Sequence, residues 1–148
     1  MLEFPLKSLR NIFKMIKNKL LRILSFFIFP ACVFVFSKFI DMAFDAYVVF
    51  PWVDIPMHFL GGISIAYTSF LFLRYFKEEG FISINRKFLH VLFVVSLVAL
   101  VAVLWEFYEF LQFYFFGIPT QPSVADTMLD LFVGLIGAAF GSFVFRNK

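Results

Sequence analysis

Charged residues are scarce in this sequence. Only 16% of its 148 residues are Asp, Glu, Lys or Arg, whereas a soluble domain carries about 25%. Hydrophobic residues make up 62%, and phenylalanine alone contributes 26 residues. A chain of this length forms one small domain, whose core cannot bury so many phenylalanine rings. The composition therefore excludes an ordinary soluble domain and predicts that lipid covers most of the surface.

Cysteine is nearly absent as well. Cys32 is the single cysteine and lies in an apolar run, so an intramolecular disulfide is excluded. We interpret it as a small hydrophobic side chain. A signal-peptidase site is also lacking, because no small-x-small sequence follows this first apolar run, which ends in Ser37, Lys38 and Asp41. We therefore expect an uncleaved first transmembrane helix.

Known catalytic signatures are missing too. The sequence contains no GxSxG, no HExxH and no Asp-Gly-x2-Ala-Arg run of the CDP-alcohol phosphotransferases. It also has no internal repeat and no low-complexity linker. These absences predict one compact bundle and leave the reaction, if there is one, unspecified by motif.

Long apolar runs dominate what is present. Four segments, at about 21–40, 55–76, 88–110 and 124–145, are each close to the roughly 20 residues that cross a hydrocarbon core. Short connections separate them, and prolines punctuate two of these connections. We predict an all-α membrane protein in which residues 21–148 form a four-transmembrane-helix bundle.

Residues 1–20 form a distinct basic segment. Its apolar residues recur at helical spacing among the bases, which is typical of an amphipathic helix lying on an anionic cytoplasmic leaflet. We expect anionic lipid as its partner and no nucleic acid. The apolar positions are Leu9, Ile12, Phe13, Ile16 and Leu20.

Lysine and arginine predict the orientation in the membrane. With four spans, the N-terminal segment, the loop near residue 77 and the C-terminus share one side, and 12 of the 13 basic residues fall there, Lys38 being the exception. We therefore expect a multi-pass protein of the inner (cytoplasmic) membrane with both termini in the cytoplasm. The twelve are Lys7, Arg10, Lys14, Lys17, Lys19, Arg22, Arg74, Lys77, Arg86, Lys87, Arg146 and Lys148.

The acidic residues gather at the opposite, outer ends of the spans. Seven of the ten acids fall there, together with His58, and most are paired at i,i+3 or i,i+4, so that each pair shares one face of its helix. The pairs are Asp54 with His58, Glu106 with Glu109, and Asp126 with Asp130; Asp41 and Asp45 complete the seven.

Small residues continue these acidic faces inward along each span. Because small residues let membrane helices approach closely, the acidic faces are expected to point at one another. They would bring five carboxylates and one imidazole into a shared pocket. The small residues are Gly62, Ala66 and Ser69 after His58, Ala99 and Ala102 before Glu106, and Gly134, Gly137 and Gly141 after Asp130.

A purely structural interpretation explains some of these acids. Asp54 can cap the second span, and Ser123 with Asp126 matches an S-x-x-D capping box. Capping does not explain Glu106 and Glu109, which sit near a helix C-terminus, where the helix dipole disfavours anions. Crowded carboxylates at low dielectric need a bound cation or shared protons. Oxygen ligands with one imidazole suit several divalent metals.

The order of these residues resembles the YjdF-like inner-membrane proteins of bacteria, a family without an assigned function. The matching stretches are Asp54-x3-His58-x2-Gly61-Gly62, Trp105-Glu106-x2-Glu109 and Asp126-Thr127-x2-Asp130-x3-Gly134-x2-Gly137-Ala138, within residues 51–141. A weaker likeness links the chain to VanZ-like membrane proteins. The resemblance supports the site residues as a set. The chain is shorter than typical relatives, which leaves open a reduced bundle or an obligate homo-oligomer.

Three functions remain open from the sequence. The first is a metal-dependent enzyme acting on a lipid or lipid-linked substrate at the outer leaflet. His58, Glu106, Glu109 and Asp130 would hold the divalent metal, and Asp54 or Asp126 would serve as general base. The second is a non-enzymatic cation-binding or transport protein. The third is a structural membrane subunit whose polar cluster fixes helix packing.

Overall fold

The computed structural model describes residues 3–84 and 86–145, with side chains from residue 8 onward. Within these ranges the chain is almost entirely helical and contains no strand. Arg146 and Lys148, which the charge pattern assigns to the cytoplasmic side, lie outside the described residues, and so do the side chains of Glu3 and Lys7. The elements are α1 (Glu3–Ser25), α2 (Ile28–Phe44), α3 (Ala46–Val49), η1 (Pro51–Val53), α4 (Asp54–Glu78), α5 (Lys87–Phe116) and α6 (Val124–Phe145).

Three helical segments of the described chain are long and apolar enough to cross a membrane. They are Pro51–Glu78, Lys87–Phe116 and Val124–Phe145. A fourth span is obtained if Ser8–Ser25 and Ile28–Phe44, which meet at a bend of 45°, count as one. The last three predicted spans thus correspond to α4, α5 and α6, with α5 extending past its expected end at residue 110.

The first predicted span is interrupted at Phe26 and Phe27. Pro30 supplies the physical reason, because it has no N–H to donate to the Phe26 carbonyl four residues earlier and its ring crowds that oxygen. The freed carbonyl accepts a hydrogen bond of 2.8 Å from the Thr68 hydroxyl of α4. Phe26 itself is buried against Phe72 and Tyr75 of the same helix. The hydrogen bond and the ring contacts at the break therefore hold the start of α2 against α4.

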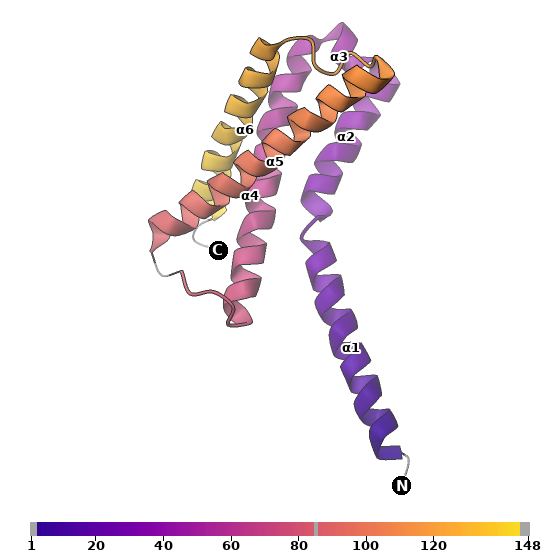
Figure 1. The fold of residues 1–148 in the computed structure, drawn as a ribbon, viewed down its shortest axis with the longest axis vertical. Helices are drawn as coiled ribbons and strands as arrows, with labels where there is room; N and C mark the ends of the chain where they lie inside the picture. The colour runs from indigo at the N-terminus through magenta and orange to yellow at the C-terminus, as the bar shows by residue number, and fades with distance from the viewer. Residues whose placement is uncertain (1–2, 85, 146–148) are drawn as a thin grey trace.

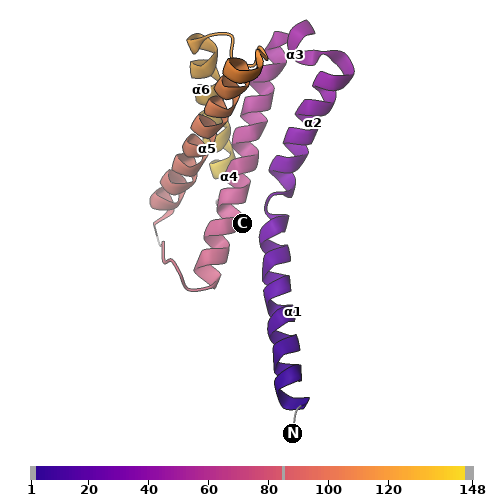
Figure 2. The same ribbon diagram turned by 45° about the vertical axis from the view of Figure 1, so that its right-hand side comes forward.

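Helices α4 and α6 form the most extensive contact in the molecule and lie side by side in both ribbon views (Figures 1 and 2). Their approach depends on glycine: a Cβ built at Gly62 would lie 2.1 Å from the Gly134 carbonyl oxygen, and one at Gly137 would lie 2.3 Å from that of Phe59. A Cβ at Gly141 would lie 3.0 Å from the Cβ of Ala66, a tight but less severe contact. The prediction that the small-residue faces of these two helices pack together is confirmed.

Helix α5 runs obliquely across this pair (Figures 1 and 2). Its buried face passes through Val94 and Val98 to Glu106, while most of its other side chains are exposed. Ala99 and Ala102, which were expected to line this face, are half-buried. Because the exposed residues are largely Leu, Val and Phe, the outer face of α5 suits a lipid environment.

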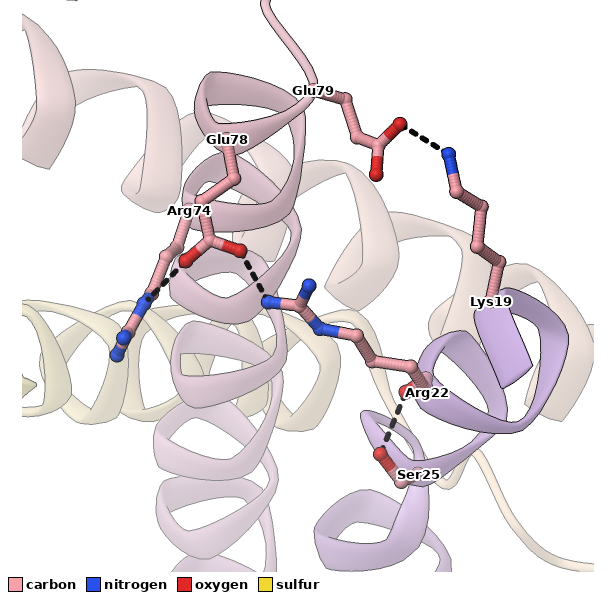
Figure 3. A network of polar contacts seen from close by, with 6 residues as sticks. All are labelled: Lys19, Arg22, Ser25, Arg74, Glu78 and Glu79. Atoms are coloured by element: carbon pink, nitrogen blue, oxygen red, sulfur yellow. Dashed lines mark hydrogen bonds and ion pairs between the residues drawn. The ribbon is translucent and has the colours of Figure 1, made fainter. Parts of the chain in front are cut away.

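Helix α1 extends away from the bundle, and its last turns lie beside the second half of α4 (Figures 1 and 2). There Lys19 and Arg22 pair with Glu79 and Glu78, each at 2.5 Å, and Arg74 also pairs with Glu78 at 3.0 Å (Figure 3). The bases of the N-terminal segment thus lie beside the loop that follows α4. The expectation that these two basic regions share one end of the molecule is confirmed.

Candidate functional site

Five of the predicted site residues come together at the end of the bundle opposite this basic network. Asp54 and His58 occupy the first turns of α4, Glu106 and Glu109 lie near the end of α5, and Asp130 lies in the second turn of α6. The close contact of α4 with α6 through glycine brings His58 and Asp130 face to face, since no side chain separates the two backbones.

His58 is shared by two groups of potential ligand atoms. The first consists of Asp54, His58 and Asp130, whose ligand atoms lie within 4.8 Å of one another. The imidazole Nε2 lies 3.3 Å from Oδ1 of Asp54 and 3.8 Å from Oδ1 of Asp130. The Asp130 side chain is only 3% exposed, which places a carboxylate deep in an apolar helix interface.

The second group consists of His58, Glu106 and Glu109, again within 4.8 Å of one another. Glu106 is 7% exposed, and its Oε2 has no hydrogen-bond partner within the described part of the chain. A buried carboxylate oxygen without a partner is costly, by about 1–3 kcal/mol or more for a charged group. This oxygen is therefore the strongest indication that the cluster accommodates a further cation or proton.

Several uncharged residues position these carboxylates, and sequence reasoning missed their roles. Trp105 donates its indole N–H to Oε1 of Glu109 at 2.9 Å, and the Thr120 hydroxyl donates to the backbone carbonyl of Glu109 at 3.0 Å. Gln121 donates to the Thr127 hydroxyl at 2.8 Å, and both side chains lie beside Glu106. The Trp105-Glu106 dipeptide of the family resemblance is the signal in the sequence that points to this tryptophan.

Tyr47 of α3 is a further residue near the site that the sequence did not single out. Its hydroxyl is 2.5 Å from that of Ser37 on α2. Burial raises the pKa of Tyr47, and the neighbouring carboxylates of Asp54, Asp41 and Glu109 raise it further. The phenol therefore stays protonated at neutral pH and can donate one hydrogen bond.

The remaining outer acids lie apart from both groups. Asp126 donates its backbone N–H to the Ser123 hydroxyl oxygen at 3.1 Å, which is the serine half of the predicted capping box. Asp45 adopts a left-handed backbone conformation (φ 48°) between α2 and α3, which aspartate tolerates better than most residues. Of the five carboxylates expected to share one pocket, the structure places four around His58.

The spacing of these atoms can be compared with what a metal ion requires. Metal–ligand distances of about 2.0–2.3 Å place neighbouring ligand atoms about 3–4 Å apart. The His58–Asp54 and His58–Asp130 distances fall in this range without any movement. The ligand atoms within each group lie up to 4.8 Å apart. Small side-chain rotations would bring the more distant ones into metal-binding range. The donor chemistry, carboxylate oxygens with one imidazole, fits a divalent cation.

The model of the family described as "Predicted membrane protein (DUF2238)" matches residues 10–147. The chain belongs to this family. The match includes most of α1 and all of the later helices, so the architecture described above is that of a DUF2238 protein over nearly its full length. YjdF-like proteins are in the DUF2238 family, which supports the resemblance at the level of the family. Searches among curated proteins and among solved structures gave no match.

Proposed function

We propose that this DUF2238 protein binds a divalent metal ion at the outer end of its helix bundle and uses it to act on a lipid or lipid-linked substrate. The observation that carries the proposal is the pair of ligand groups that share His58, with the buried Oε2 of Glu106 left without a partner. His58, Glu106, Glu109 and Asp130 would hold the ion. Several acids around one imidazole have no arginine or lysine among their described contacts, so a cation is the natural counter-charge.

The remaining acids fit the role of general base. Asp54 has the most exposed side chain of the clustered aspartates, 27% against 3% for Asp130, and water can therefore reach it. Asp126 lies one turn before Asp130 and is half-buried. A bound metal lowers the pKa of its water, and either carboxylate could accept the proton.

A substrate in the membrane is supported by the surroundings of the cluster. The helices that carry the ligands are apolar over most of their length, and α5 exposes Leu104, Phe107 and Leu111 close to Glu106 and Glu109. An acyl chain can lie along such a surface while its polar part reaches the cluster. Lys38 is the only base predicted on this side, so phosphate groups would be neutralised mainly by the metal.

The transport alternative requires a polar path through the inner half of the bundle. The buried hydroxyls there are engaged within the protein: Ser64 donates to Gly61, Ser69 to Ile65 and Thr68 to Phe26. Ser142 alone among them, in the described chain, has an unpartnered buried oxygen. These bonds favour a one-sided site over a path across the membrane.

The proposed topology has four spans, of which the first runs from the end of α1 through α2. It has both termini in the cytoplasm of a bacterial inner membrane and the apolar face of α1 against anionic lipid. The contact of α1 with lipid is supported by Leu9, Ile12 and Phe13, whose apolar side chains are exposed in the described structure.

Metal content measured by inductively coupled plasma mass spectrometry tests the proposed function. We expect stoichiometric divalent metal in detergent-purified protein and its loss in a folded Glu109→Ala/Asp130→Ala variant. Metal-loaded protein would then be screened for hydrolysis of lipid phosphates and lipid-linked substrates. Absence of metal from the parent protein, even after divalent ions are added back, would exclude the metalloenzyme and favour shared protons with a structural role.

A further inference from the structure

A second polar site lies at the opposite end of the molecule, in a groove between α1 and α4. The groove has a volume of about 320 Å³ and is lined by Arg22, Ser25, Phe26, Tyr67, Leu71 and Arg74. At the end of α1 and the start of the break, one face carries residues 22, 25 and 26. One face of α4 carries residues 67, 71 and 74. Two short stretches therefore supply two guanidiniums to one cavity.

The two arginines share a single carboxylate. Arg22 donates from Nη2 to Oε2 of Glu78 at 2.5 Å, and Arg74 donates from Nε to Oε1 of the same group at 3.0 Å, as Figure 3 shows. The Arg22 guanidinium also lies 5.3 Å from the centroid of the Tyr75 ring. Since a guanidinium has five N–H donors, Arg22 keeps donors beyond the one that Glu78 accepts. These remaining donors are available to a further anion.

The charge around the groove favours an anion. The network of Figure 3 contains three bases, including Lys19, and two acids. Further bases flank it in sequence on α1, and Lys77 lies in the last turn of α4. Clusters of this kind at the inner ends of membrane helices attract the phosphate groups of acidic lipids.

The depth of the groove distinguishes a lipid from a soluble anion. Arg74 lies one turn from the end of α4, whereas Tyr67 lies about 16 Å from that end at 1.5 Å per residue. With the inner end of α4 placed at the lipid headgroups, as in the proposed topology, the groove reaches from there into the hydrocarbon region. Its deeper wall is formed by Phe26 and Leu71, which suit the glycerol and the first acyl carbons.

We propose that this groove is a binding site for one anionic phospholipid of the inner leaflet, whose phosphate is held by Arg22 and Arg74. The site is independent of the acidic cluster at the other end, and it differs from general adsorption of the basic helix because it needs the guanidinium of Arg22 in particular. Phosphoryl oxygens accept from guanidinium in the same paired geometry as carboxylates.

Native mass spectrometry of the full-length, detergent-purified protein with added phosphatidylglycerol tests this proposal. We expect one phosphatidylglycerol bound per chain in preference to phosphatidylcholine. Arg22→Gln should weaken this binding about tenfold, the effect of losing a charge-assisted hydrogen bond. Lys14→Gln is the matched control, because it removes one positive charge from the exposed surface of the same helix. Equal losses in both variants would mean general adsorption and would overturn the proposal.

Glu78→Gln separates lipid binding from helix packing. It breaks the same ion pair as Arg22→Gln but leaves both guanidiniums in place, so phosphatidylglycerol binding should stay the same or strengthen. Loss of binding in this variant would show that the ion pair only holds α1 to α4, and the proposal would fail. Competition with inorganic phosphate is the last test. If millimolar phosphate displaces the lipid, the groove recognises a free anion and the assignment to a phospholipid is wrong.

Discussion

The Cα of Gly62 faces the backbone of Gly134 so closely that a Cβ at position 62 would lie 2.1 Å from the Gly134 carbonyl oxygen. One turn before these glycines on each helix stand His58 and Asp130, whose side chains lie 3.8 Å apart. The acidic cluster therefore depends on a helix contact that contains no charged group.

Replacing Gly62 by alanine should disrupt both stability and the site. The new methyl group has no room and must push α4 away from α6, at a cost of about 1–3 kcal/mol. We expect a lower unfolding temperature in detergent together with weaker metal binding. Gly61→Ala is the matched control, since a Cβ there meets nothing within 4 Å. Equal effects at the two positions would contradict the packing described here.

Glu106→Gln should have opposite effects on stability with and without metal. In metal-free protein the substitution replaces a buried carboxylate, whose Oε2 has no partner, by a neutral amide, so the unfolding temperature should stay the same or rise. With metal present, the variant loses a ligand and should fall below the parent protein. Asp126→Asn is the companion variant: because Asp126 lies in neither ligand group, metal content should be unchanged. Thermal unfolding in chelator and in added divalent ion distinguishes these cases, and a parent protein unaffected by either would refute the metal site.

Trp105→Phe should lower metal affinity about tenfold, because orienting hydrogen bonds to metal ligands contribute on this scale. The indole N–H holds Oε1 of Glu109 at 2.9 Å, and phenylalanine cannot replace that donor. Trp52 is the only other tryptophan and is 64% exposed, so Trp52→Phe should leave affinity unchanged. In that second variant Trp105 is the sole indole fluorophore, and its emission should change on metal addition. A constant emission would argue against metal binding beside Glu109.

Thr68→Val should destabilise the protein by about 1–3 kcal/mol, because it leaves the Phe26 carbonyl unpaired in a buried position. Ser69→Ala is the control, since its hydroxyl bonds only to Ile65 of its own helix. In a Pro30→Ala background, residue 30 regains an N–H that can serve the Phe26 carbonyl, so Thr68→Val should cost less. A double-mutant cycle on unfolding in denaturant measures this coupling, and strictly additive costs would show that Pro30 does not cause the break.

Fusions of alkaline phosphatase should report the proposed orientation. The enzyme folds only outside the cytoplasm, so a fusion after Gly80 should be inactive and one after Gly117 active. A fusion after Phe50 should also be active, because the proposed topology crosses the membrane once before α4. Green fluorescent protein at the same positions should give the reverse pattern. An active fusion after Gly80 would invert the proposed topology.

Much of this protein followed from the sequence, because the relevant physics is local along each helix. The last three spans were located by length and hydropathy, and the i,i+3 and i,i+4 spacings placed each acid pair on one face. Gly62, Gly134 and Gly137 predicted where α4 and α6 would touch. Pro30 lies within the first predicted span, and its missing N–H was a readable signal of the break at Phe26.

Only the tertiary structure decided which side chains from different helices meet. Helical spacing says nothing of how far each helix is rotated or shifted against its neighbour, and those quantities follow from the packing of Gly62 on Gly134 and of α5 across both helices. That packing places Asp54, Glu106, Glu109 and Asp130 around His58 and leaves Asp126 outside both groups. It also brings Arg22 to Arg74 through Glu78, a contact between residues more than fifty positions apart that no local pattern encodes.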